Sequence, residues 1–400
     1  MQGLASRSRP NAIRFTAVAL AAVLQIATVV YLGTSVSGGD AYTYIDLADD
    51  WRSLSALVSP DAFESNFWPA GYPGFLALFS WAGSGQILAT RFAQVALAAA
   101  VALMAGRLAD RVSWTAGTVT SVVVAISPTA LWAVWAIGYE LLLGFLLLAG
   151  LLLALRASDS GSRFAALFAG LLFGLALLVQ FRSLLAVIVL VGIVGFGMRR
   201  LALTMVVGVM VPLLLWAVRS LMAVGNPAPW SANGPYNLWN GNNPLATGHN
   251  VFPIPDLPRG YTSYTAAALD WIIANPADFL SVTARKFLYL FEPTRIAGVS
   301  DPFPGEFVVT GIEFIVAAFL VTGILCFVIL RLGRRAGELQ PLDLPFWFAV
   351  AYLLPNVVFI VEARFAIPVH AILVGVTVSG YYVLARERLI RPKVSSTPAD

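Results

Sequence analysis

Residues 12–31 read AIRFTAVALAAVLQIATVVY, an apolar run that contains a single charged residue, Arg14. A hydrocarbon core about 30 Å thick is crossed by roughly 20 helical residues, so a run of this length predicts a transmembrane helix. The run is too long for the apolar part of a signal peptide, and no convincing small-residue cleavage site follows it. We therefore expect it to be retained as the first membrane span.

Similar runs recur along the whole chain. Hydrophobic residues make up 59% of the 400 residues, against roughly 45–50% in soluble domains, and the mean hydropathy is +0.80. The sequence predicts an all-α polytopic membrane protein, with residues 1–400 forming a single integral membrane domain. We expect ten spans, near residues 12–33, 86–106, 113–128, 133–155, 164–180, 184–198, 201–222, 307–331, 343–361 and 365–385. The small residues of Gly170–Gly174 and Gly192–Gly197 are expected to allow close packing between spans.

Basic residues mark one side of this predicted bundle. They lie before or at the start of the first span and in five later segments: Arg7, Arg9, Arg14; Arg107, Arg111; Arg156, Arg163; Arg199, Arg200; Arg331, Arg334, Arg335; Arg386, Arg388, Arg391, Lys393. All six groups fall on the same side if the N-terminus is cytoplasmic, as the positive-inside rule requires. We therefore expect a cell (plasma or inner) membrane protein with both termini in the cytoplasm. The net charge of +4 then reflects topology, and no nucleic-acid partner is expected.

Two segments on the opposite, external side are too long to be turns: residues 34–85 and residues 223–306. Within the first, the spacing of apolar residues predicts an interfacial amphipathic helix over residues 43–58, with Tyr44, Leu47, Trp51, Leu54 and Val58 on one face. A second such helix is predicted over 262–290, broken at Asn275-Pro276. The tract between, residues 226–259, is rich in Pro, Asn and Gly and is expected to be an ordered loop.

Four aspartates follow the first span within eleven residues: Asp40, Asp46, Asp49 and Asp50. The helical spacing places Asp46, Asp49 and Asp50 on a solvated helix face. Asp40 either caps the interfacial helix, a role worth about 1 kcal/mol, or uses its carboxylate in function.

Other charged residues lie at the external ends of predicted spans, where a charge needs a partner, water or a function. For Glu140 we favour a functional role over a purely structural ion pair. Arg182 could snorkel to the interface or bind a ligand. Arg285 and Lys286 suit lipid headgroups or one specific phosphate, and Glu362 and Arg364 could simply pair with each other.

Redox and metal chemistry have little support in the composition. The single cysteine, Cys326, lies in an apolar run, so no intramolecular disulfide can form. The only histidines, His249 and His370, fall in a loop and a span, which makes a two-histidine site improbable. His249 with a carboxylate leaves a divalent cation open, and we assign no metal ligand and no certain cofactor.

Ordered motifs carry a resemblance. Trp-Pro-Ala-Gly-Tyr-Pro-Gly-Phe at 68–75 and Arg-Phe-Ala-Gln at 91–94 resemble the first-loop signature of the dolichyl-phosphate-mannose protein mannosyltransferase superfamily. These are membrane glycosyltransferases of GT-C architecture, and the lipid A aminoarabinose transferases belong to the same group. The resemblance continues in order through residues 127–140, 169–176, 182, 237–244, 275–286 and 362–368. No single motif is specific, but the ordered set covers nearly the whole chain.

The resemblance implies a GT-C bundle of about ten transmembrane helices that transfers a sugar, with inversion, from a polyprenyl-phosphate donor. The acceptor hydroxyl would belong to a lipid, glycan or protein on the external face, and membrane lipids would surround the enzyme. Asp40 matches the family's catalytic base, and Glu140 stands in its second acidic position, to orient the acceptor or assist Asp40. The remaining roles that the resemblance implies are donor-phosphate binding by Arg182, Arg285, Lys286 and Arg364, and sugar or lipid contact by Trp68, Tyr72, Asn240 and Asn242. For the asparagines, capping turns within the loop is an equal alternative.

One position departs from the family. Protein mannosyltransferases often carry paired acids where this chain has Asp40-Ala41, which weakens the expectation of a protein acceptor. Two other functional classes stay open: a transporter or flippase of a glycolipid, and a ligase or polymerase of surface glycans. A transporter would more naturally place ionisable residues near mid-membrane, whereas the acids here lie at the external interface.

Overall fold

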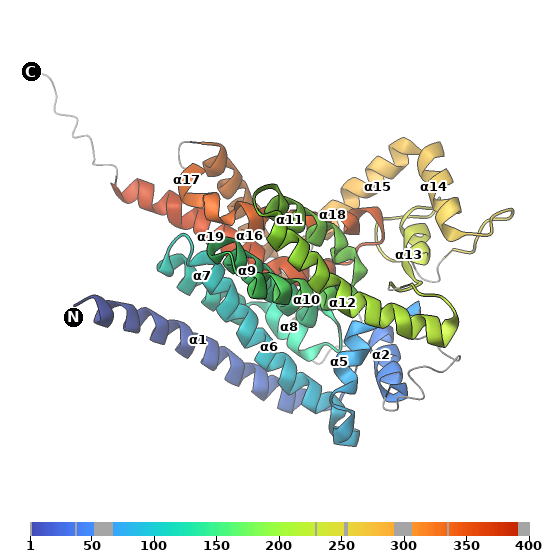
Figure 1. Ribbon diagram of the computed structural model, residues 1–400, viewed down its shortest axis with the longest axis horizontal. Coiled ribbons are helices and arrows are strands. Elements are labelled where there is room, and N and C mark those ends of the chain that lie inside the picture. The colour runs from blue at the N-terminus through green and yellow to red at the C-terminus, as the bar shows by residue number, and fades with distance from the viewer. Residues whose placement is uncertain are drawn as a thin grey trace, which may run out of the picture.

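The computed structural model describes residues 2–36, 38–51, 67–228, 230–251, 255–291, 306–333 and 336–390. Within these residues the chain is helical, and the only strand-like pairing is one isolated parallel bridge between His249 and Val361. The helices form an elongated bundle (Figure 1).

The long helices of the bundle are α1 (Gln2–Leu32), α6 (Gln86–Ala109), α7 (Trp114–Ile126), α9 (Glu140–Ser160), α10 (Arg163–Val179), α11 (Leu184–Gly197), α12 (Arg199–Val224), α16 (Glu306–Leu332), α18 (Asp343–Val358) and α19 (Ile367–Ile390). Shorter helices are α2 (Gly39–Asp50), α5 (Gly71–Ala77), α8 (Pro128–Trp135), α13 (Gly234–Gly241), α14 (Tyr264–Ala274), α15 (Pro276–Tyr289) and α17 (Ala336–Leu339). Four 3₁₀ turns, Ser80–Gly85, Phe181–Ser183, Gln340–Leu342 and Ala363–Ala366, lead into α6, α11, α18 and α19.

Seven of the described helices are long and apolar enough to cross a membrane, or eight if the bent pair of α7 and α8 counts as one span. The helices α10 and α11 are apolar but shorter. Each of the ten predicted spans thus corresponds to a helix, and the prediction of an all-α multi-pass membrane protein is confirmed.

The boundaries of the third and fourth predicted spans are corrected. Residues 128–135 form α8, which bends by 48° from α7, and α9 begins only at Glu140 rather than at residue 133. The bend has a local cause, because the Ser127 hydroxyl accepts a hydrogen bond from Ala130 N and Pro128 stands in the first turn of α8.

Close helix packing occurs at one of the two predicted glycine pairs. A Cβ on Gly170 or Gly174 of α10 would overlap the Met205 or Val209 carbonyl of α12, so the two backbones are in contact. In the interval Gly192–Gly197, a Cβ on Gly192 or Gly197 would meet nothing within 4 Å, and one on Gly195 would make only an ordinary contact of 3.5 Å with Ala202 Cβ of α12, so the backbones are not in close contact there.

The helices of the two predicted external segments gather at one end of the bundle. Figure 1 places α2, α5 and α13–α15 at the end opposite the start of α1 and the end of α19, and we call this the loop end. The predicted apolar face of α2 is confirmed for Tyr44, Leu47 and Trp51, which are buried, while Asp46, Asp49 and Asp50 are exposed as predicted. Leu54 and Val58 lie outside the described residues.

The second long segment also follows its pattern. The helices α14 and α15 occupy the predicted interval and break at Asn275-Pro276. The tract 226–259, expected to be a loop, contains one short helix, α13. Together these elements cover the ends of the spans from which the candidate site is built.

Candidate active site

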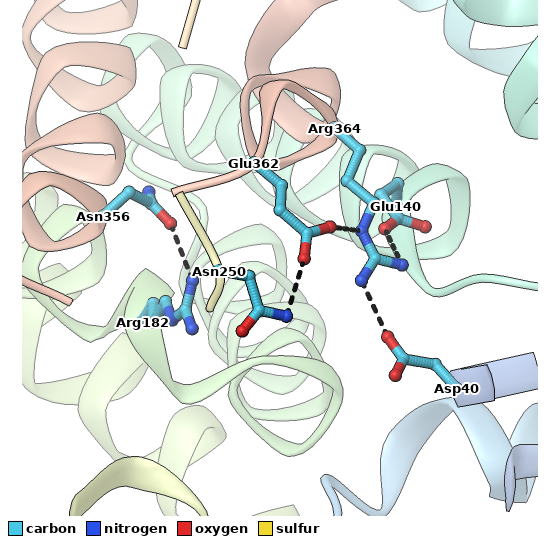
Figure 2. A network of polar contacts seen from close by, with 7 residues as sticks. All are labelled: Asp40, Glu140, Arg182, Asn250, Asn356, Glu362 and Arg364. Carbon is cyan, nitrogen blue, oxygen red and sulfur yellow. Dashed lines mark hydrogen bonds and ion pairs between the residues drawn. The ribbon is translucent and has the colours of Figure 1, made fainter. Parts of the chain in front are cut away.

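The polar site at the loop end is centred on the guanidinium of Arg364, which three carboxylates surround (Figure 2). Nη2 donates to Asp40 Oδ2 at 2.7 Å, Nε donates to Glu362 Oε2 at 2.5 Å, and Nη1 lies 3.5 Å from Glu140 Oε1. The three acids come from α2, from the turn before α19 and from the start of α9. The structure therefore brings together Asp40, Glu140 and Arg364, which the sequence singled out separately, and it contains the pair of Glu362 with Arg364 that the sequence left as an alternative.

Asp40 is held in the first turn of α2 and is not its cap. The N-cap is Gly38, whose φ of 97° suits glycine, and no side chain caps this helix. The positive end of the helix dipole favours an ionised carboxylate there, and Asp40 gives that carboxylate to Arg364. Its neighbour Ala41 is buried in the apolar core, where a second acid would be desolvated.

Aromatic side chains hold α2 in place against the following segment. The ring of Tyr44 packs edge-on against Trp68, at 5.8 Å between centroids, and against Tyr72, at 5.4 Å. Trp68 is half-buried and Tyr72 is 1% exposed, and the Tyr72 hydroxyl donates to Gln94 Oε1. These rings position Asp40 by packing, and Tyr72 has no surface to offer a ligand in this state.

Glu140 begins α9 directly after the break at residues 136–139. Its side chain is 1% exposed, and Gly138 leaves space for it, because a Cβ at position 138 would overlap Glu140 Oε2. A buried carboxylate requires a cation or a proton, and Arg364 is the cation beside it.

The packing of α9 on α19 sets the relation between these two residues. A Cβ on Gly144 would lie 3.1 Å from the carbonyl oxygen of Pro368, so the helices touch at this point. Glu140 and Arg364 each stand four residues, about one turn, before the contact. The two groups are therefore presented from neighbouring helix starts.

Two buried polar residues of α6 fix the backbone on either side of the site. Arg91 donates to the carbonyls of Gly33, Ser35 and Trp135, and Gln94 donates to those of Ala133, Val134 and Ala136. These carbonyls belong to the chain just before Asp40 and just before Glu140. Part of the motif at 91–94 thus supports the two acids by satisfying carbonyls that the helix ends leave open.

Arg182 lies next to the Arg364 cluster. Its guanidinium carbon is 4.5 Å from the centre of the Phe365 ring, and that of Arg364 is 5.7 Å from the same ring. Arg182 Nη1 also donates to Asn356 Oδ1 at 3.3 Å. Two cations therefore lie near one aromatic ring, and Figure 2 shows both guanidinium groups.

The side chains of Arg285 and Lys286 lie in different environments. Arg285 is exposed on α15, whereas Lys286 is fully buried and donates to Asn242 Oδ1 at 3.2 Å and to the carbonyl of Val358 at 3.3 Å. Burial lowers the pKa of Lys286 to about 7. The structure does not bring this pair to Arg364, and their phosphate-binding role stays a prediction.

The asparagines of the second loop are structural in this state. Asn242 Nδ2 donates to the carbonyls of Leu238 and Val358, and Asn240 donates to Asn250 Oδ1 and accepts from Val251 N. Both side chains are fully buried. Of the two alternatives, these contacts match capping within the loop.

Two residues of the network were missed or undervalued by sequence reasoning. Glu362 was weighed only as a partner of Arg364, yet its Oε1 also accepts from Asn250 Nδ2 at 3.4 Å. Asn250 lies in an Asn- and Gly-rich tract, and no charge or spacing there could have identified it. For metals, no group of three His, Cys, Asp or Glu that could hold an ion occurs among the residues that the structure describes.

Comparison with known proteins found no matching family model and no matching curated protein. Among solved structures, the chain resembles the oligosaccharyltransferase of Archaeoglobus fulgidus, crystallised with a disulfide-tethered acceptor peptide that contains the NVT sequon. The two share 14% identity with a TM-score of 0.51, over 94% of this chain and 50% of the archaeal one. The chain thus spans about half the length of that protein, and it has the GT-C-type fold of a multi-pass membrane protein.

Proposed function

We propose that this protein transfers a sugar from a polyprenyl-phosphate donor to an acceptor hydroxyl on the external face of the membrane. The observation that supports this proposal most directly is the convergence of Asp40 and Glu140 on Arg364 at the loop end of a GT-C-type bundle. Carboxylates and a cation within contact distance are what the reaction needs.

Asp40 is the proposed general base. As the acceptor oxygen attacks the anomeric carbon, its proton passes to the Asp40 carboxylate. The bond from the anomeric carbon to the phosphate oxygen breaks, its electron pair stays on the phosphate, and the configuration inverts. The products are the glycosylated acceptor and the polyprenyl phosphate, which is a stable leaving group that needs no acid.

Arg364 and Arg182 are the proposed donor-phosphate ligands. An arginine pairs with phosphate in bidentate geometry, and the charge that develops on the leaving phosphate is stabilised by a preplaced cation. Arg364 is occupied by carboxylates here, so the donor phosphate would exchange with one of them. An exchange with Asp40 would release its carboxylate from Arg364 and leave it available to the acceptor hydroxyl as the donor arrives.

The other members keep supporting roles in this proposal. Glu140, buried beside Arg364, orients the acceptor or assists Asp40. Arg285, exposed on α15, suits a lipid headgroup, and Lys286 would act through Asn242, which it contacts. The acceptor would be a lipid, glycan or protein.

A second candidate follows from the solved structure that the chain resembles. That protein is an oligosaccharyltransferase with a peptide acceptor, so the donor here could carry an oligosaccharide and the acceptor could be a peptide. An identity of 14% over half of the archaeal chain favours neither substrate. We prefer a donor that carries a single sugar because of the ordered motifs around Asp40.

The lipid that co-purifies with the protein would distinguish these candidates. We expect mass spectrometry of that lipid to identify a polyprenyl-phosphate monosaccharide, and the purified protein to convert it to polyprenyl phosphate when an acceptor is supplied. A lipid-linked oligosaccharide would support the second candidate. If the protein in proteoliposomes only moves the sugar lipid from one leaflet of the bilayer to the other and leaves it chemically unchanged, glycosyl transfer is refuted and a flippase is supported.

A further inference from the structure

The loop at residues 248–251 lies directly against the segment that carries the site. His249 pairs with Val361 in a parallel bridge, and Val361 N donates to the Gly248 carbonyl at 3.4 Å. Glu362 and Arg364 follow Val361 by one and three residues. Backbone pairing therefore brings a stretch of the second long segment next to the Arg364 cluster.

The position of this loop is fixed by buried contacts. Gly248 has a φ of +109°, and a Cβ there would lie 2.9 Å from the Tyr289 ring. Both the backbone conformation and the lack of space therefore favour glycine at this position. The fully buried Asn240 side chain donates to Asn250 Oδ1 at 2.5 Å and accepts from Val251 N at 3.1 Å. The loop is thus held from both sides, which is expected of a loop that presents a binding surface.

Three kinds of chemical group meet on this loop. The exposed His249 stacks on Tyr289, with ring centroids 3.7 Å apart and planes 17° from parallel. Beside it, the exposed Asn250 directs its amide Nδ2 to Glu362 Oε1, and Figure 2 shows Asn250 and Glu362 facing each other next to Arg364. The result is an aromatic platform, an amide and a carboxylate, adjacent to a candidate catalytic cluster.

This combination suits a sugar ring better than other ligands. A sugar has a C–H face that packs on an aromatic ring, and a rim of hydroxyls that donate to carboxylates and exchange hydrogen bonds with amides. A phosphate would be repelled by Glu362. An apolar chain would exclude water from the amide and the carboxylate without offering either group a hydrogen bond.

We infer that His249, Tyr289, Asn250 and Glu362 form a sugar-binding subsite that seats one ring beside Arg364. The inference rests on the proposed function, since it names where the sugar of that reaction is held. The ring belongs either to the donor, with its phosphate toward Arg364, or to a saccharide acceptor with its hydroxyl toward Asp40. Asn240 then acts as a positioning residue, because it holds Asn250 and does not touch the sugar.

Binding to matched lipids tests the subsite. The probes are undecaprenyl phosphate and its mannosyl, glucosyl and arabinosyl derivatives in detergent micelles, with the best-bound sugar lipid taken forward. We expect His249→Ala, which removes the aromatic face, and Asn250→Ala, which removes a partner of the sugar hydroxyls, each to weaken binding of the sugar lipid by about tenfold or more. Binding of sugar-free undecaprenyl phosphate should change less than about twofold.

Two further variants separate the subsite from a folding defect. His249→Phe keeps an aromatic face and is expected to retain most of the affinity. Thr247→Ala, at the exposed position directly before this loop, is the matched control and should bind both lipids as the wild type does.

A second arm identifies the source of the sugar. If donor affinity is unchanged but His249→Ala and Asn250→Ala raise the KM for a saccharide acceptor, the subsite belongs to the acceptor. If both variants match Thr247→Ala in both arms while the wild type transfers sugar, the subsite is refuted and the proposed function stands. A wild type that binds none of the sugar lipids and glycosylates no acceptor would overturn both.

Discussion

At the residue scale, Arg364 is the point on which the site depends. Its three contacting nitrogens face three different carboxylates, one of which is fully buried. Removing one partner of a buried ion pair costs about 3–5 kcal/mol, because the remaining charge is left desolvated. The arginine therefore has two separable roles: it neutralises Glu140 in the resting protein, and we propose that it binds the donor phosphate.

Replacing Arg364 should affect both roles. We expect Arg364→Ala to lower the free energy of unfolding by about 3–5 kcal/mol and to reduce the transfer rate by at least about a hundredfold. Arg364→Lys keeps the charge but loses the planar guanidinium that binds phosphate in bidentate geometry. This variant should therefore retain more of the wild-type stability than of the wild-type transfer rate. Thermal unfolding in detergent and a radiolabelled-sugar transfer assay measure the two effects.

The control for Arg364 is Arg111→Ala, which breaks the partly exposed pair of Arg111 with Asp159 and should cost no more than about 1 kcal/mol. If Arg111→Ala lost as much stability and transfer activity as Arg364→Ala, the proposed roles of Arg364 would be contradicted.

Lys286 gives a prediction about pH. Burial lowers its pKa to about 7 in the folded protein, against about 10.4 in an unfolded chain. Between these values the unfolded state binds more protons, so the contribution of Lys286 to stability rises with pH from about 7 to about 10.4. Relative to Lys286→Met, the wild-type unfolding temperature should therefore increase from pH 7 to pH 9. If the unfolding temperatures of the two proteins changed with pH in parallel, Lys286 would not be the source of the pH dependence.

At the element scale, the apolar patterns predicted the helices well, and local polar chemistry explains where they failed. The spacing of Tyr44, Leu47 and Trp51 identified the buried face of α2. The division of residues 128–160 into α8 and α9 escaped prediction, because α8 is itself apolar and continues the hydrophobic pattern. That division is stabilised by Gln94 and Arg91, which bind carbonyls near it from α6, and such a long-range contact leaves no local signal.

Two glycines of neighbouring helices give a matched test of packing. In Gly170→Ala the added Cβ would overlap the Met205 carbonyl of α12, whereas in Gly192→Ala it would meet nothing within 4 Å. We expect Gly170→Ala to destabilise the protein by about 3 kcal/mol or more, since two backbones must separate. Gly192→Ala should be neutral or up to about 1 kcal/mol stabilising, since alanine favours helix. Unfolding temperatures in detergent compare the pair, and equal values would disprove the close contact of α10 and α12.

At the scale of the whole molecule, the bundle has two distinct ends. The start of α1 and the end of α19 lie at one, and α2, α5 and α13–α15 lie at the other (Figure 1). This arrangement agrees with the division of basic residues along the sequence, which predicts a cytoplasmic terminal end and an external loop end. It would place the Arg364 cluster outside.

Cysteine labelling tests this orientation. Cys326 is the only cysteine, so a Cys326→Ser background accepts single reporters, Thr247→Cys at the loop end and Ser160→Cys at the opposite end of α9. A membrane-impermeant maleimide should label Thr247→Cys in intact cells and Ser160→Cys only after permeabilisation. The reverse pattern would invert the topology.

The site itself was only partly predictable from the sequence. Asp40 and Arg364 stood out because charges are rare in this chain, but they are 324 residues apart, and nothing in either segment indicates that they touch. The contact of Arg364 with Glu140 in turn requires α9 and α19 to meet at Gly144 and Pro368. Asn250 carries no charge, so only the fold reveals its place beside Glu362.

The central claim is that Asp40 is the catalytic base, and it depends on one side chain among four neighbouring aspartates. Asp40→Asn removes the basic carboxylate while keeping the shape of the side chain, and Asp46→Asn alters an exposed residue of the same helix. The most direct measurement is the transfer rate of both variants from a saturating polyprenyl-phosphate sugar, with donor binding measured in parallel. We predict that Asp40→Asn binds the donor but transfers at least about a hundredfold more slowly, while Asp46→Asn matches the wild type. A wild-type transfer rate in Asp40→Asn would contradict the claim.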